Sequence, residues 1–322
     1  MRHLATLAFT VAAMLPAASA GRDFRSAEIH PADYPTTLSV QYMGKLLSER
    51  TQGRYGIHVY PAGVLGTEKD TIEQLRIGGL DMMRINSAAL NSMVPETIVT
   101  VMPFLFRSTE HMHKVLDGPI GDEILASMES QGIVGLAFYD SGARNFYSAK
   151  KPIRSLADMK GLKVRVQQSD LFVALVEALH ANPTPMPYGE VYTALKTGIV
   201  DAAENNWPSY ESSRHFESAR FYTLSEHSMA PEVLAFSKVI WDRLPKEDQA
   251  AIRKAAKDSV PYMRKLWDER EVKSRKAVEA AGCQVITLAD KKEFIDAMKP
   301  VYEKFANTPK LKDLVRRIQE TK

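Results

Sequence analysis

The sequence has a single cysteine among its 322 residues, which excludes an internal disulfide. Cys283 follows Gly282 in an apolar context, so we expect a buried thiol there. Charge of one sign is also missing, because 42 Lys and Arg stand against 39 Asp and Glu without a basic tail or an arginine-rich block. The composition therefore gives no support for nucleic-acid binding, and stability has to come from packing.

Signatures of catalysis are absent as well. The chain contains no Gly-x-Ser-x-Gly elbow, no phosphate-binding glycine loop and no His-Glu-x-x-His motif. His111 and His113 lie two positions apart on a predicted helix and face different ways, so they do not predict a metal pair. The Glu226-His227 pair lacks a third positioned partner, and we expect it to be exposed. The sequence thus predicts no enzyme, no metal and no cofactor.

Long apolar runs are missing except at the N-terminus. Leu4 to Leu15 is a mostly apolar run, preceded by a basic start at Arg2 and followed by the small residues Ala18-Ser19-Ala20. This pattern predicts a secretory signal over residues 1–20, with a buried N-terminal helix as the alternative. No other segment approaches the ~18 apolar residues of a membrane span. We therefore expect a soluble chain exported to the periplasm.

Strand-like and helix-like segments alternate through residues 21–322. The hydrophobic periodicity predicts strands at 55–60, 98–102, 134–139, 161–167, 198–201 and 231–236. It predicts helices at 34–50, 67–77, 111–116, 120–131, 171–180, 190–197 and 246–281. Such alternation is typical of an α/β fold with mixed sheets covered by helices. The last helix would be roughly 50 Å long, enough to bridge two lobes, with a kink or a helix junction at Pro261.

Polar side chains occur at the ends of these strands. The segment 161–167 alternates so that Arg165 lies on the opposite face from Val164 and Val166. A guanidinium delivered on a rigid strand suits the two-pronged binding of a carboxylate, and ligands collect at strand ends in open α/β sheets. The candidate ligand-binding residues are Glu68, Asn86, Arg144, Arg165, Tyr188 and Asn205.

Each candidate also has a simpler explanation. Glu68 could serve only the helix N-terminus, Asn86 and Asn205 could form turns, and Tyr188 could belong to the core. We place Arg144 in the loop that follows strand 134–139, and Asn205 in a polar turn. The two arginines, flanked by apolar strands, are harder to explain as surface residues.

Several linked motifs resemble a known family. They are Gly161-Leu162-Lys163-Val164-Arg165-Val166, the segment Pro185 to Leu195, and Val200-Asp201-Ala202-Ala203-Glu204-Asn205. In this order they resemble the solute-binding proteins of tripartite ATP-independent periplasmic (TRAP) transporters, the DctP-like family. The resemblance covers residues 21–322 and implies a periplasmic-binding-protein architecture. Two α/β lobes with mixed sheets would be joined by hinge strands and a long helix, and would close over an organic acid.

The resemblance implies roles for several residues. Arg165 matches the family arginine that clamps the ligand carboxylate, and Arg144 matches a second arginine found in many members. Asn205 matches an asparagine that meets the same carboxylate, and Tyr188 takes the aromatic position against the ligand.

Residues of the first lobe would contact the other end of the ligand. Glu68 and Asn86 fall at such positions, and His30 lies where the first strand ends. Asn86 replaces an acidic residue of the sialic-acid binders. The run Glu204 to Tyr210 resembles that of members which bind hexuronates.

The resemblance implies a periplasmic solute-binding subunit that captures a sugar acid such as glucuronate or galacturonate. It would deliver this acid to the small and large TRAP membrane subunits without performing chemistry. We expect one lobe from 21–141 and 231–270, and another from 142–230 and 271–322. The alternatives are a binder of another organic acid such as an aldonate or a dicarboxylate, a secreted sugar-acid lyase, and a sensor.

Overall fold

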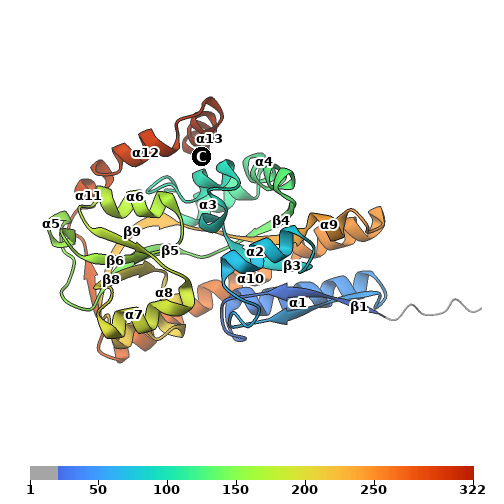
Figure 1. Cartoon of the computed structure of the whole chain (residues 1–322), viewed down its shortest axis with the longest axis horizontal. Coiled ribbons are helices and arrows are strands. Elements are labelled where there is room, and N and C mark those ends of the chain that lie inside the picture. The colour runs from blue at the N-terminus through green and yellow to red at the C-terminus, as the bar shows by residue number, and fades with distance from the viewer. Residues whose placement is uncertain (1–20) are drawn as a thin grey trace, which may run out of the picture.

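The computed structural model describes residues 21–322, so the expected signal sequence lies outside the described part of the chain. Two mixed β-sheets form the framework (Figure 1). The first has the order β2-β1-β3-β10-β4 and consists of β1 (Arg22–Ala27), β2 (Tyr55–Tyr60), β3 (Met82–Asn86), β4 (Ile133–Tyr139) and β10 (Glu232–Ser237). The second has the order β11-β9-β5-β8-β6-β7 and consists of β5 (Ala143–Ser148), β6 (Lys163–Val166), β7 (Asn182–Pro185), β8 (Ala202–Asn205), β9 (Phe221–Met229) and β11 (Gln284–Thr287).

The chain crosses between the two sheets at two places. The chain leaves the first sheet after β4 and enters the second at β5, and it returns from β9 to β10. β4 pairs antiparallel with β10, and β5 pairs antiparallel with β9. The two crossings therefore lie side by side, as expected for hinge strands. We call the first sheet with the elements packed on it the first lobe, and the second sheet with its elements the second lobe.

Helices cover both sheets, which gives the mixed α/β class that the alternating pattern predicts. They are α1 (Pro35–Arg50), α2 (Glu68–Arg76), α3 (Thr109–Leu116), α4 (Pro119–Ser127), α5 (Leu156–Met159), α6 (Asp170–Ala178), α7 (Val191–Thr197), α8 (Trp207–Ser212), α9 (Lys238–Trp241), α10 (Lys246–Ala280), α11 (Lys292–Asp296), α12 (Lys299–Phe305) and α13 (Pro309–Glu320). Short 3-10 helices are η1 (Ser87–Leu90), η2 (Pro95–Thr100), η3 (Met128–Gln131), η4 (Tyr188–Glu190) and η5 (His215–Glu217).

The long helix α10 contacts both lobes. It packs on α1 and β4 of the first lobe and on α8 of the second. Ile252, Met263 and Trp267 bury their side chains in the same hydrophobic cluster as Phe24 of β1. The helix runs without interruption through Pro261, so the predicted alternative of a junction between two helices is wrong.

Local predictions were wrong for two strands and for the placement of two candidate residues. Residues 98–102 do not form a strand, because Pro95 begins the 3-10 helix η2, and a short apolar run does not distinguish the two structures. The strand predicted at 198–201 begins later as β8, since Gly198 ends α7 with a positive φ of 75°. Arg144 lies in β5 and not in a loop, and Asn205 lies in β8 and not in a turn. The two strands pair with each other.

The division into lobes at 141/142, 230/231 and 270/271 stays a proposal. All strands of each sheet fall within the corresponding ranges. The C-terminal helix α13, however, packs on η2 and α4 of the first lobe, above which it lies in Figure 1. Tyr302 of α12 reaches the same side, where its hydroxyl donates to the Pro103 carbonyl at 2.8 Å.

Two further features of residues 21–322 bear on the sequence predictions. None of their helices combines the length and the apolar character that a bilayer-spanning helix needs. Cys283 is a free, buried thiol, as predicted, and Tyr210 donates a hydrogen bond to its Sγ at 3.4 Å.

Candidate functional site

A cavity of about 570 Å³ lies between the two lobes. Both sheets contribute the ends of strands to its wall. The structure brings all seven predicted site residues to this wall, namely His30, Glu68, Asn86, Arg144, Arg165, Tyr188 and Asn205. That they touch a ligand stays a prediction, but their convergence from separate parts of the chain makes the cavity the candidate site.

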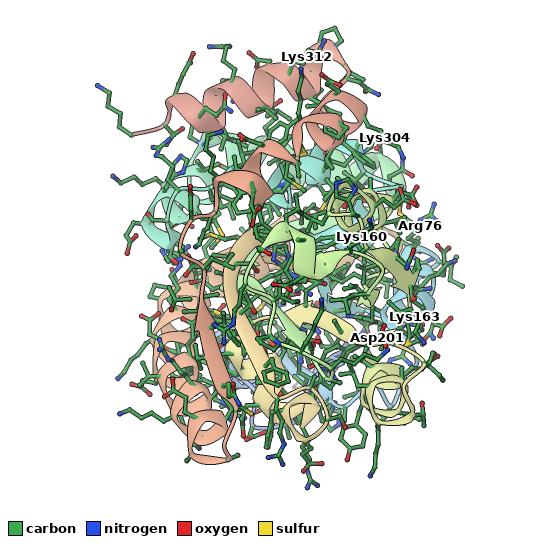
Figure 2. All side chains as sticks on the ribbon, turned by 90° about the vertical axis from the view of Figure 1, so that its left-hand side faces the viewer. Arg76, Lys160, Lys163, Asp201, Lys304 and Lys312 are labelled. Atoms are coloured by element: carbon green, nitrogen blue, oxygen red, sulfur yellow. The ribbon has the colours of Figure 1, made fainter. Side chains whose placement is uncertain are left out.

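Arg165 is positioned by β6. Val164 and Val166 are buried in the core on one face of this strand, and Arg165 points from the other face with 3% of its surface exposed. The backbone N–H of Lys163 donates to Asp201 Oδ2 at 3.0 Å and ties β6 to the segment before β8. Figure 2 labels both residues, which lie near each other in that view. The cavity therefore receives a guanidinium from a rigid element.

The guanidinium of Arg165 has no carboxylate partner within residues 21–322. Its Nε and Nη2 both donate to the carbonyl oxygen of Met186, at 3.1 and 2.7 Å, and its Nη1 has no partner there. Burial lowers the pKa of Arg165. The nearby Glu204 opposes this effect without pairing with Arg165, and Arg144 adds to it. A buried cation without a counter-charge is costly, so this position is prepared for an anion.

Arg144 is also buried, with 2% of its surface exposed, but it is fully paired. Its Nη2 donates to Glu204 Oε1 at 2.8 Å, its Nε contacts Glu204 Oε2, and its Nη1 donates to Asn205 Oδ1 at 3.1 Å. Burial alone raises the pKa of Glu204, but Arg144 and His227 together outweigh it, and the pKa is lowered to about 2. The amide Nδ2 of Asn205 has no partner in the described chain and remains available as a donor beside the cavity.

The first lobe presents carboxylates to the cavity. Arg84 of β3 is 1% exposed and contacts three of them. Its Nη1 lies 2.6 Å from Glu232 Oε2 and 3.3 Å from Glu68 Oε1, and its Nε donates to Glu28 Oε1 at 3.0 Å. Glu68 and Glu232 line the cavity, whereas Glu28 lies behind them.

Glu68 does not cap its helix. Thr67 and Asp70 form the capping box of α2, with Asp70 N–H donating to Thr67 Oγ1 and Thr67 N–H donating to Asp70 Oδ2. The Glu68 side chain turns toward β3, where its Oε1 accepts from the backbone N–H of Asn86 at 2.8 Å. Its Oε2 has no partner among the described residues, so a free acceptor faces the cavity.

Asn86 caps the 3-10 helix η1 and also lines the cavity. Its Oδ1 accepts from Ala88 N–H, and its Nδ2 donates to the Ala230 carbonyl and to Glu232 Oε1, each at 3.0 Å. All its side-chain polar atoms have protein partners. Asn86 therefore orients Glu232 from inside the first lobe.

Aromatic rings from both lobes meet at the cavity. His30 stacks on Tyr34 with 3.9 Å between ring centroids and meets Tyr188 of the second lobe edge-on at 5.2 Å. Burial and the charge of Arg84 lower the pKa of His30 to about 3, so its imidazole is neutral at ordinary pH. The Tyr188 hydroxyl contacts Ser213 and belongs to the wall, not to the closed core.

Buried hydrogen bonds join the lobes beside the cavity. Ser169 Oγ of the second lobe donates to Asn91 Oδ1 of the first at 2.9 Å. The Tyr34 hydroxyl lies 2.8 Å from Ser209 Oγ. Because these groups are buried, the bonds favour the arrangement in which the lobes enclose the cavity.

Sequence reasoning missed the carboxylate cluster around Arg84. Its signal was present, since Arg84 interrupts the apolar run Met82-Met83-Arg84-Ile85 and a buried arginine requires acidic partners. The partners Glu28 and Glu232 are 56 and 148 positions away, so no local pattern reveals them.

Residues that suggested catalysis have other partners. His227 is buried and not exposed as predicted, because it stacks on Phe146 and its Nδ1 bonds Ser225 Oγ at 2.9 Å. Within residues 21–322 no group of three or more His, Cys, Asp or Glu side chains could hold a metal ion.

Two hinged α/β lobes around a polar cavity define the class of solute-binding proteins. The sequence model of the DctP family, described as bacterial extracellular solute-binding protein, family 7, matches residues 26–308. The chain belongs to this family and is a TRAP solute-binding protein.

Solved structures and curated proteins agree with this assignment. A TRAP periplasmic solute-binding protein from Bradyrhizobium sp. BTAi1, in complex with α/β-D-galacturonate, is 70% identical with a TM-score of 0.92, covering 93% of this chain and all of that one. One from Roseobacter denitrificans with bound β-D-glucuronate is 45% identical with a TM-score of 0.91, covering 94% of this chain and all of that one. A solute-binding protein of Chromohalobacter salexigens is 40% identical over 92% of this chain and 89% of its own length.

Proposed function

We propose that this protein captures a hexuronate, D-galacturonate or D-glucuronate, and delivers it to TRAP membrane subunits. The single observation that carries the ligand class is Arg165, a buried guanidinium on the cavity wall with no carboxylate partner in the described chain. A ligand carboxylate would supply the missing negative charge through charge-assisted hydrogen bonds. Two similar structures that hold hexuronates support this proposal.

The polarity of the cavity suits a sugar with one acid group. Arg165 and the free amide of Asn205 offer donors in the second lobe, and Glu68 offers an acceptor in the first. A hexuronate has one carboxylate and several hydroxyl groups that donate to such an acceptor. The proposed ligand contacts are Arg165, Arg144, Asn205 and Tyr188 in one lobe and Glu68, Asn86 and His30 in the other.

Isothermal titration calorimetry tests the ligand class. We expect D-galacturonate and D-glucuronate to bind, while D-galactose and D-glucose, which lack the carboxylate, do not. At 100 times the dissociation constant, a bound uronate adds about 2.7 kcal/mol of stability, which raises the melting temperature. Equal affinity for a uronate and its neutral hexose would refute the carboxylate clamp.

The proposed transport role requires no chemistry on the ligand. We propose that the protein is not an enzyme and works in the periplasm, with small and large TRAP membrane subunits as partners. Uronate incubated with the protein and followed by NMR is expected to remain unchanged, whereas a lyase would form an unsaturated product. Uronate uptake by vesicles that contain the membrane subunits is expected to require this protein.

A further inference from the structure

The cluster around Arg84 carries an excess of negative charge. One guanidinium contacts the carboxylates of Glu28, Glu68 and Glu232, and no other cation pairs with these three among residues 21–322. Burial alone raises the pKa of Glu28, but Arg84 outweighs it and leaves that pKa lowered. Most of the cluster is closed to water, so its charge is weakly screened.

The unpartnered oxygen of this cluster faces the ligand space. Glu28 is enclosed, since its Oε1 accepts from His30 N–H at 3.0 Å and its Oε2 from Thr36 Oγ1 at 2.8 Å. Glu232 uses its two oxygens for Arg84 and Asn86. Only the Oε2 of Glu68 in this described cluster lacks a partner, and its side chain retains 18% exposure at the cavity.

This wall distinguishes a hydroxyl from a carboxylate. Above pH 7, where Glu68 is ionised, a ligand hydroxyl donates to its Oε2, whereas a carboxylate brings only acceptors and a further negative charge. Two like charges about 4 Å apart at an effective dielectric constant of 20 weaken binding by on the order of several-hundred-fold. The opposite wall, with Arg165, accommodates one carboxylate. The other arginines that line the cavity, Arg84 and Arg144, are paired, and the lining Lys69 is exposed to solvent, where its charge is screened.

We infer that Glu68, backed by Glu28 and Glu232, is a specificity-determining residue that admits acids with one carboxylate and rejects dicarboxylates. The inference rests on the proposed function, because it assumes that the carboxylate of the ligand lies on Arg165. Selectivity against dicarboxylates would then come from repulsion by Glu68 as well as from attraction by Arg165.

Calorimetry with three matched acids, carried out at about pH 8 so that Glu68 is ionised, tests the inference. D-galacturonate has one carboxylate, galactarate has two on the same carbon skeleton, and D-galactonate has the open chain of galactarate but one carboxylate. In the wild type we expect galactarate to bind at least ~100-fold more weakly than D-galacturonate, and more weakly than D-galactonate. In Glu68→Gln the disadvantage of galactarate is expected to shrink by at least ~10-fold.

Controls separate this effect from misfolding and from net charge. Glu68→Gln leaves Arg84 two carboxylates, and a cooperative unfolding transition in urea reports that this variant is folded. Glu279→Gln on α10 removes one exposed carboxylate, which pairs with Arg275. This variant is expected to leave the ratio of the affinities for D-galacturonate and galactarate unchanged.

Several results would overturn the inference. They are wild-type binding of galactarate within ~3-fold of D-galacturonate, galactonate as weak as galactarate, and an unchanged ratio in Glu68→Gln. In each case tight binding of D-galacturonate by the wild type would leave the proposed function standing. Failure of the wild type to bind D-galacturonate would refute the proposed function itself.

Discussion

Arg165 donates two hydrogen bonds to the carbonyl oxygen of Met186 and forms no ion pair within the described chain. The carbonyl orients the guanidinium without neutralising it. The neighbouring Arg144 differs, because Glu204 neutralises it completely. We therefore expect Arg165 to serve ligand binding and Arg144 to serve structural stability.

Replacing Arg165 is expected to abolish tight binding without unfolding the protein. Arg165→Lys keeps the charge but loses the planar fork, so we expect a loss of roughly 2–5 kcal/mol in uronate binding. Arg165→Met removes an uncompensated buried cation, and the free protein is expected to be as stable as the wild type or more stable. Calorimetry and urea unfolding measure the two effects. Binding by Arg165→Lys at the wild-type level would remove this residue from the site.

Replacing Arg144 is expected to reduce the stability of the free protein more than replacing Arg165 does, and to weaken uronate binding less. Arg144→Met leaves Glu204 buried without its counter-charge, which costs about 3–5 kcal/mol of unfolding free energy. Arg144→Lys is expected to weaken uronate binding less than Arg165→Lys does. Urea unfolding of the free protein provides the comparison. If Arg144→Met were as stable as Arg165→Met, the structural role of the Arg144–Glu204 pair would be contradicted.

The hydrogen bond between Ser169 and Asn91 is expected to favour the closed arrangement of the lobes. Neither residue lines the cavity, so Ser169→Ala acts only through closure. Losing one such bond costs about 1 kcal/mol, which corresponds to roughly fivefold weaker uronate binding.

Small-angle scattering tests the same motion. The wild type with saturating uronate is expected to have a smaller radius of gyration than the free protein, and Ser169→Ala should require more ligand for the same change. Ser130→Ala, at an exposed hydroxyl of η3, is the control. Unchanged affinity in Ser169→Ala would show that this bond does not contribute to closure.

The stability of the free protein is expected to depend on Glu68 between pH 4.5 and 7. Burial raises the pKa of Glu68 from 4.5 to about 7, although Arg84 opposes the rise. The folded chain then holds a proton that the unfolded chain has lost. Stability therefore falls as pH rises from about 4.5 to about 7 and levels off above, with a contribution of about 1–3 kcal/mol.

A second group titrates in the same range and serves as a comparison. Burial and then Asp268 raise the pKa of Glu271 to about 7. Urea unfolding across this pH range is expected to show a shallower slope in Glu68→Gln and, independently, in Glu271→Gln. Curves of Glu68→Gln and wild type that stay parallel from pH 4.5 to 7 would contradict the raised pKa of Glu68.

Much of the fold follows from local sequence signals. The alternation at 161–167 predicts both strand β6 and the face that carries Arg165. The periodicity at 246–281 predicts α10 almost to the residue, because a long amphipathic run has a single interpretation. The resemblance of the linked motifs predicts the family, and the seven site residues that it implies all lie on the cavity wall.

The charge state of each site residue could not be predicted in this way. Arg144 is neutralised because β5 and β8 pair with Phe146 opposite Glu204, a register that the sequence does not reveal. The partners of Arg84 likewise come from separate segments: Glu28 follows β1, Glu68 begins α2 and Glu232 begins β10. Pairing between remote residues therefore decides which arginine is free for a ligand.

A crystal structure of the protein with D-galacturonate is the most direct test of the central claim. We predict that both carboxylate oxygens face the guanidinium of Arg165 at about 2.7–2.9 Å, and that a sugar hydroxyl donates to Glu68 Oε2. A ligand bound in this cavity with its carboxylate away from Arg165, or turned toward Glu68 and Glu232, would contradict the account.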